Sequence, residues 1–237
     1  MSGVRARLWV AGVLGALAVL VVLALLVLQL GRKDPSPPSL RDNPNPAIPG
    51  RIAYIDSESC IWVAEASGAT RKKVACSDFP DWVSWVDADT VGFASYAEPG
   101  RTHWFEVDIG TGDVRDLGVI NQWPREPSLT RPDGVTVRID YDDGTVYRVE
   151  GTERTVMYSA NYPDGHVPRA MFWSPDGRWL VLQYWAPRAN GAEVWIVAED
   201  GTAAGTLATG VWGSANPVSW WIDGLGFTPD TGVVLPD

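Results

Sequence analysis

One short sequence unit recurs along this 237-residue chain, and it restricts the fold more than any other feature. Its clearest copy, Trp173–Leu182, reads WSPDGRWLVL, which is a Pro-Asp-Gly turn followed by an apolar strand. Weaker copies make the unit start at residues 85, 130, 173 and 220, so successive starts are 45, 43 and 47 residues apart. A period of this length is typical of one four-stranded β-sheet in a repeated array. The chain is therefore predicted to contain about four copies of one sheet.

A second series of segments repeats at the same interval. These segments are rich in aromatic and β-branched residues, and each precedes a glycine-containing turn: 60–64, 103–107, 145–149 and 193–197. No stretch after residue 50 shows a helical period. A single four-stranded sheet cannot bury both faces, so the sheets must pack on one another, with the 13 Trp residues as bulky filler. The expected fold class is all-β: a β-propeller of about four, or five, four-stranded blades.

The number of blades stays open in the sequence. The first copy begins at Arg51–Ile55 and lacks an inner strand, which 216–221 could supply by closing a ring of four blades. Residues 225–228 would then form one strand too many. An incomplete ring of five blades and closure by a second chain are the alternatives.

The repeat resembles a known family. Trp173-Ser174-Pro175-Asp176-Gly177 followed by an apolar strand, and then an aromatic strand that ends in Asp200-Gly201-Thr202, is similar to the TolB-type β-propeller repeat. Similar repeats occur in bacterial surface lipoproteins and in the propeller halves of prolyl oligopeptidases. The resemblance covers 51–227 and implies a TolB-like propeller domain over 51–237 in a bacterial setting.

The N-terminal 33 residues predict a membrane anchor. Leu8–Leu30 is an uncharged apolar run of 23 residues, long enough to cross a bilayer core of about 30 Å as a helix. A cleaved signal peptide would have a shorter apolar region and a small-residue cleavage site. The positive-inside rule gives a tie, because two basic residues stand on each side of the run. We expect a single-pass signal anchor with the folded domain outside the cytoplasm.

Residues 34–50 contain six prolines, a composition typical of an extended polyproline II spacer. We therefore expect this segment to be a semi-rigid linker between the anchor and the propeller domain.

The charge of the chain argues against one class of partner. The sequence has 19 basic and 29 acidic residues, a net charge of −10. Without the four basic residues that flank the apolar run, 15 bases face 29 acids, a net charge of −14 from residue 34 onward. Such a domain repels phosphate backbones, so nucleic acid is not expected as a partner.

The two cysteines, Cys60 and Cys76, lie eight residues either side of Gly68, the expected centre of a hairpin turn. Antiparallel pairing would place them opposite each other, close to disulfide geometry. We expect a structural disulfide, which also favours an oxidising compartment over two free thiols.

No pattern in the sequence predicts catalysis or a cofactor. With His103 and His166 as the only histidines and no paired cysteine motif, a zinc site of the usual kind cannot be assembled. Gly213-Ser214-Ala215 does not match a nucleophile elbow. Residues 140–144 read as a hairpin turn rather than a calcium loop. A pair of carboxylates for glycoside hydrolysis would be invisible at this level.

One set of aromatic residues suggests binding. The connectors between the outermost strand of one blade and the innermost strand of the next each contain one such residue: Phe79, Trp123, Tyr162 and Trp212. Exposed around one mouth of the central channel, these rings could stack on a sugar or grip a peptide. The alternative is that each ring wedges between neighbouring blades.

The sequence thus favours a non-catalytic extracytoplasmic module for binding or scaffolding. It would be tethered to the membrane and would recognise an envelope protein or a cell-wall glycan through one propeller face. The alternative is a propeller-type enzyme, such as a glycosidase or lyase. A propeller by itself says little about function, which resides in its loops.

Overall fold

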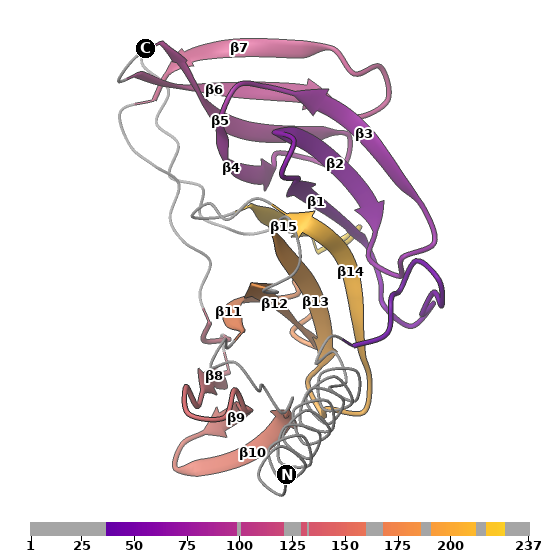
Figure 1. Ribbon diagram of the computed structural model, residues 1–237, viewed down its shortest axis with the longest axis vertical. Helices are drawn as coiled ribbons and strands as arrows, with labels where there is room; N and C mark the ends of the chain where they lie inside the picture. Colours follow the sequence, from indigo (N-terminus) through magenta and orange to yellow (C-terminus); the bar gives the residue numbers. More distant parts are fainter. Residues whose placement is uncertain are drawn as a thin grey trace, which may run out of the picture. The chain divides into compact units, whose positions relative to one another are not determined.

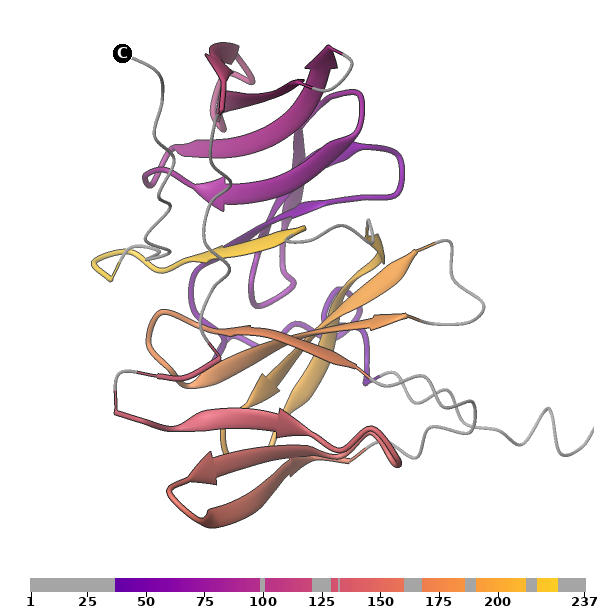
Figure 2. The same cartoon turned by 90° about the vertical axis from the view of Figure 1, so that its left-hand side faces the viewer.

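The computed structural model describes residues 37–98, 101–120, 129–131, 133–159, 168–185, 191–211 and 217–225. These residues contain fifteen β-strands in four antiparallel sheets and no helix (Figures 1 and 2). The first sheet has the strand order β15-β1-β2-β3, formed by Val218–Trp221, Arg51–Ile55, Cys60–Glu65 and Arg71–Cys76. The second sheet contains β4 (Pro80–Trp85), β5 (Thr90–Glu98), β6 (Arg101–Asp108) and β7 (Val114–Val119). The third sheet contains β8 (Thr136–Ile139), β9 (Val146–Glu150) and β10 (Glu153–Tyr158). The fourth sheet contains β11 (Arg169–Trp173), β12 (Trp179–Trp185), β13 (Ala192–Ala198) and β14 (Ala204–Val211).

The Pro-Asp-Gly unit forms the turn between the first two strands of the fourth sheet. Ser174 N donates to Trp179 O (2.7 Å), and Ser174 Oγ accepts from Trp179 N (3.0 Å). Gly177 has φ +67°, a conformation that glycine adopts without steric cost. The Pro-Asp-Gly unit therefore forms a turn that reverses the chain between two apolar strands, as its composition predicts.

The C-terminal strand β15 completes the first sheet. It pairs antiparallel with β1, with Arg51 opposite Trp221 and Ile52 opposite Trp220. Trp220 is fully buried, and its indole N–H donates to Pro49 O (2.9 Å). The expectation that the end of the chain supplies the missing inner strand of the first copy is confirmed. The proposed extra strand at 225–228 lies almost wholly outside the described residues.

The third sheet has three described strands rather than four. Its turn before β8 matches the turns that follow the innermost strands of the second and fourth sheets, and a bridge joins Thr130 to Thr136 across it. Residues 121–128, which precede this turn in the sequence, lie outside the described residues.

Three hydrophobic cores join the sheets in pairs. One core joins the first and fourth sheets and contains Ile52, Phe172 and Ile196. A second joins the first and second sheets through Ile55 and Phe93, and a third joins the third and fourth sheets. Among the described residues no shared core joins the second sheet to the third. The arrangement is propeller-like, and a closed ring is not found in it.

The described part of the proline-rich segment is not a free spacer. Leu40 and Ile48 are 4% and 3% exposed and belong to the core between the first and fourth sheets. Ser39 forms a parallel bridge with Thr206 of β14, whose hydroxyl donates to Pro37 O (2.8 Å). Residues 37–50 are thus part of the folded unit, because two apolar side chains among the prolines fill the space beside β14.

The predicted membrane span, Leu8–Leu30, lies outside the described residues. In the ranges that the structure does describe, no helix has the length and apolar character needed to cross a membrane.

Candidate functional site

Bonds between the sheets show which strand ends lie together. Arg51 Nη2, at the start of β1, donates to a carbonyl just before β5 (2.7 Å). Arg131 Nη1, just before β8, donates to Gly177 O, just before β12 (2.7 Å). Asp56, which follows β1, forms a β-bridge with Val211 at the end of β14. Strand β14 runs parallel to β12, because both strands pair antiparallel with β13. Strands β1, β5, β8 and β12 therefore end on one side, which we call the aromatic end.

This end is named for its exposed rings. Four aromatic side chains in the described part of the chain are largely exposed: Phe79 (65%), Tyr96 (44%), Tyr141 (72%) and Trp185 (49%). Tyr96 and Trp185 lie near the ends of β5 and β12, and Tyr141 follows β8. Phe79 precedes β4, which is antiparallel to β5. All four rings thus come from loops or strand termini on the same side of the molecule.

Of the four residues of the predicted aromatic rim, one lies among the described residues. This residue, Phe79, is 65% exposed. Trp123, Tyr162 and Trp212 lie outside the described residues, so their rim role stays a prediction. Sequence reasoning overlooked Tyr96, Tyr141 and Trp185. Their signal was available, because each stands at or just beyond the end of a strand that follows a repeat turn.

The segment that carries Phe79 is held in a defined conformation. Ser77 Oγ donates to Ser95 Oγ (2.8 Å), and Ser95 Oγ in turn donates to Asp78 O. Phe79 has φ +52°, which is unusual for a bulky residue, and the strain requires that the surrounding contacts hold the backbone. These hydroxyl contacts position the exposed ring at the start of β4.

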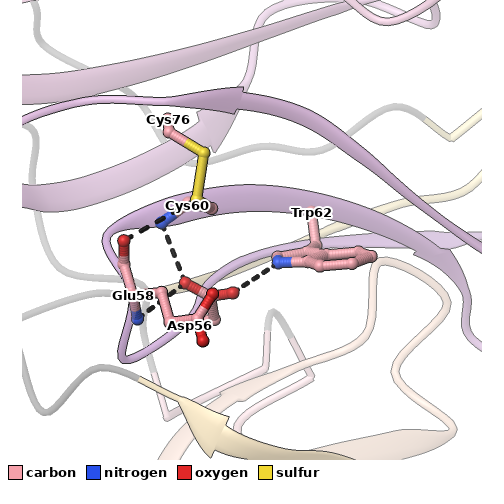
Figure 3. Close-up of a disulfide and its surroundings, with 5 residues drawn as sticks. All are labelled: Asp56, Glu58, Cys60, Trp62 and Cys76. Carbon is pink, nitrogen blue, oxygen red and sulfur yellow. Dashed lines mark hydrogen bonds between the residues drawn. A yellow bond between two sulfur atoms is a disulfide. The ribbon is translucent and has the colours of Figure 1, made fainter.

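A disulfide joins strands β2 and β3 of the first sheet at the aromatic end (Figure 3). Cys60 and Cys76 face each other on β2 and β3 with a Cα–Cα distance of 3.9 Å, which confirms the expected disulfide. Asp56 Oδ1 accepts from Cys60 N (2.8 Å) and Asp56 Oδ2 accepts from Trp62 Nε1 (2.6 Å). Cys60 is 5% exposed, whereas Cys76 is exposed, so the loop is pinned by a bond that solvent reaches from one side.

Acidic side chains accompany the aromatics at this end. They lie in the β1–β2, β3–β4 and β8–β9 loops: Asp56, Glu58, Asp78, Asp140, Asp142 and Asp143. The predicted hairpin turn at 140–144 is confirmed, since Gly144 N donates to Asp140 O (2.8 Å) and Thr145 N to Asp143 Oδ1 (2.8 Å). The hydrogen bonds from Thr145 lower the pKa of Asp143. Within the described ranges no group of acids, histidines and cysteines is arranged to hold a metal ion.

His103 is oriented by a carboxylate at the same end. Its Nδ1 lies 3.0 Å from Asp116 Oδ2, and its Nε2 is buried with no hydrogen-bond partner in the part of the chain that the structure describes. Burial tends to raise the pKa of Asp116, but the N–H of Gly118 and the His103 ring together lower it. His103 stands opposite Ser95 across β5 and β6. His166, the other histidine, lies outside the described residues, as do Gly213–Ala215.

A cavity of about 470 Å³ lies at the opposite end, where β1 begins. Its walls combine apolar and charged side chains, including Pro46, Ile48, Arg51, Glu65 and Asp223. The guanidinium of Arg51 also lies over the ring of Trp85, 5.0 Å from its centroid. Arg51 also lies 3.6 Å from Asp223, and Glu65 accepts a hydrogen bond from Ser67, so the charged groups of this cavity already contact other protein groups.

No protein-family model matches the chain, and no curated protein matches it in sequence. Among solved structures, TolB from Acinetobacter baumannii is 18% identical with a TM-score of 0.27, covering 67% of this chain and 41% of that one. A putative TolB from Agrobacterium tumefaciens is 16% identical with a TM-score of 0.26, covering 73% and 61%. An oligogalacturonate lyase in complex with manganese is 13% identical with a TM-score of 0.28, covering 68% and 50%. The chain matches less than two thirds of the length of each of these three structures.

The class of the protein therefore follows from its own sheets. It is an all-β protein of propeller-like architecture, in which one end of the strands carries exposed aromatic rings, acidic loops and a loop closed by a disulfide.

Proposed function

We propose that the chain is a non-catalytic binding module that recognises a glycan chain through its aromatic end. The observation that carries this proposal is the gathering of Phe79, Tyr96, Tyr141 and Trp185 at one end, all largely exposed. Flat rings stack on the apolar faces of sugars, and the carboxylates beside them accept hydrogen bonds from sugar hydroxyls. The excess of acidic residues disfavours an anionic glycan, so the proposed ligand is a neutral or cationic glycan.

The four sheets are proposed to close into a ring. This closure would bring Trp123, Tyr162 and Trp212 to the aromatic end beside Phe79. The domain is further proposed to be extracytoplasmic, held at the membrane by Leu8–Leu30, and the disulfide supports this placement because disulfides persist in oxidising compartments.

The experiment is a binding measurement on the full chain in detergent against an array of neutral, cationic and anionic glycans. Single variants Phe79→Ala, Tyr96→Ala and Trp185→Ala are expected to weaken binding to the preferred glycan by roughly tenfold each. Their melting temperatures should stay close to that of the parent chain, since exposed side chains contribute little to stability.

Val114→Ala is the matched control. Val114 is 50% exposed at the start of β7, which lies at the other end of the second sheet, and its truncation should leave binding unchanged. Equal loss of binding in the control and the aromatic variants would contradict the assigned end. If the chain binds peptides and no glycan, the proposed ligand class is wrong.

An enzyme, such as a glycosidase or lyase, is the second candidate because of His103. Its Nδ1 is held by Asp116, and its Nε2 is buried without a hydrogen-bond partner among the described residues, so a polar group of a ligand that reached this nitrogen would be its partner. Release of reducing ends or unsaturated products from the bound glycan, abolished in His103→Gln, would favour this candidate over binding alone.

A further inference from the structure

Strand β3 carries a cluster of positive charge. It begins Arg71-Lys72-Lys73, and all three side chains are exposed. The Arg71 guanidinium and the Lys73 ammonium lie over the ring of Trp62, at 5.1 and 5.7 Å from its centroid. Trp62 is stacked on Tyr54 at 6.5 Å between centroids. Two cations are thus held side by side on an aromatic platform at the outer edge of the first sheet.

A third cation belongs to the same group. Burial raises the pKa of Tyr54, and the nearby positive charges of Arg71 and Arg41 both act to lower it. No ion pair between Arg41, Arg71 or Lys73 and an acid is found in the described ranges. Asp56, whose charge also acts on Tyr54, is bound by the indole N–H of Trp62 and by two backbone N–H groups.

The distribution of lysine is unusual. The chain has only three lysines, Lys33, Lys72 and Lys73, in a domain that is otherwise strongly acidic. Lys33 follows the predicted span, and the other two are adjacent on β3. Lysine on an edge strand commonly discourages pairing with other chains. The outermost strands β7, β10 and β14 contain no lysine, so edge protection alone does not account for the placement.

The length of the chain ties this cluster to the membrane. Pro37 is bonded to Thr206 within the folded unit, seven residues after Leu30, the end of the predicted span. Even fully extended, seven residues reach about 25 Å. Arg41 follows Pro37 by four residues, and Leu40 packs at the Gly68 turn that leads into β3. If Leu8–Leu30 spans the bilayer, this tether keeps Pro37 within about 25 Å of its surface.

We propose that Arg71 and Lys73, which lie over Trp62, dock together with Arg41 against the anionic headgroups of the bilayer that holds the chain. This docking surface is separate from the aromatic end. It orients the folded unit, so that the glycan-binding loops keep a fixed direction relative to the membrane. Ammonium and guanidinium groups supply the charge, and the half-buried indole supplies the amphipathic surface that interfaces favour.

The test uses the three lysines as reporters. The full chain is inserted into nanodiscs of phosphatidylcholine, with or without phosphatidylglycerol, and treated with an amine-reactive acylating reagent that does not cross membranes. Mass spectrometry then gives the acylation rate of each lysine. Each basic residue near an anionic surface contributes roughly fivefold, so Lys73 should react about tenfold or more slowly in the phosphatidylglycerol discs. The difference should vanish in about 1 M NaCl, where the Debye length is about 3 Å.

Lys72 is the internal reference. Its ammonium is already bonded to Ile109 O (2.8 Å) and Gly110 O (3.0 Å) on the opposite face of β3, so its rate should change less. The variant Arg41→Gln/Arg71→Gln should lose the protection of Lys73. Arg154→Gln, the same charge change on exposed β10, should keep it.

Equal acylation of Lys73 in discs with and without phosphatidylglycerol overturns the proposal, whether or not a glycan is bound, because any protection would then not depend on charge. Aggregation of Arg41→Gln/Arg71→Gln in detergent, with Lys73 still protected in its monomers, would assign the cations to edge protection instead.

Discussion

Removal of the disulfide is the perturbation whose effect can be worked out most directly. The bond joins Cys60 to Cys76 across a separation of 16 residues. In the chain-entropy treatment, closing a loop of this size in the unfolded chain stabilises the folded state by about 3 kcal/mol. The double variant Cys60→Ser/Cys76→Ser should therefore lose about 3 kcal/mol in free energy of unfolding. For a folded unit of this size that corresponds to a drop in melting temperature of roughly 6–12 °C.

The assay is thermal and urea unfolding of the full chain in detergent, followed by tryptophan fluorescence. Reduction of the parent chain provides the control, because Cys76 is exposed and a reductant reaches the bond without unfolding. The reduced parent chain and the double variant should melt at the same temperature, since the chain has no other cysteine.

The slope of the free energy against urea should stay nearly constant if the disulfide acts mainly by restricting the unfolded chain near one hairpin. A double variant that melts within about 2 °C of the parent chain would refute the reasoning. A reduced parent chain that keeps its melting temperature while both thiols titrate as free would refute it equally.

Three further predictions concern the folded unit. Leu40→Ala should cost about 2–4 kcal/mol in urea unfolding, because Leu40 is 4% exposed in a shared core, whereas a residue in a free spacer would cost nothing. Gly92→Ala should cost about 1–3 kcal/mol, since its new methyl group would overlap the ring of Trp104, while Gly110→Ala serves as a nearly neutral control. Several aspartates have a lowered pKa in the folded state, so their stabilisation is present above the ordinary aspartate pKa and is lost as the pH falls through the lowered values: Asp108, Asp116, Asp133, Asp143 and Asp200. The melting temperature should therefore fall as the pH is lowered below about 4, and a flat profile from pH 5 to pH 2.5 would contradict this assignment.

Local sequence signals predicted the elements of the fold well. The aromatic segments at 60–64, 103–107, 145–149 and 193–197 became β2, β6, β9 and β13, and the glycine turns between strands lie where expected. The disulfide was predicted from symmetry about Gly68. Cys60 does pair with Cys76, although one register shift lies between Ile61 and Trp62 on the way to the turn. The use of the C-terminal strand by the first sheet followed from a missing strand in the first repeat.

The proline-rich segment shows the limit of composition. Six prolines predicted an extended spacer, but the described residues 37–50 contain turns and bends. Composition also gives no information on whether Leu40 and Ile48 meet an apolar surface. That surface is made by Ala64, Val194 and Leu207, which come from different sheets. The packing of 37–50 therefore depends on the assembled sheets. Leu40 and Ile48 belong to the core, although a linker was expected here.

What the sequence by itself determined is the all-β repeat: alternation of side chains, turn residues and the period between copies act over a few residues at a time. The tertiary structure decided which residues meet. The aromatic end has exposed rings from separate sheets, His103 contacts Asp116 on the neighbouring strand, and Arg71 and Lys73 lie over the ring of Trp62. These groupings depend on which faces and ends of the sheets come together, and that is settled by burial of the hydrophobic cores between sheets, which no local pattern encodes.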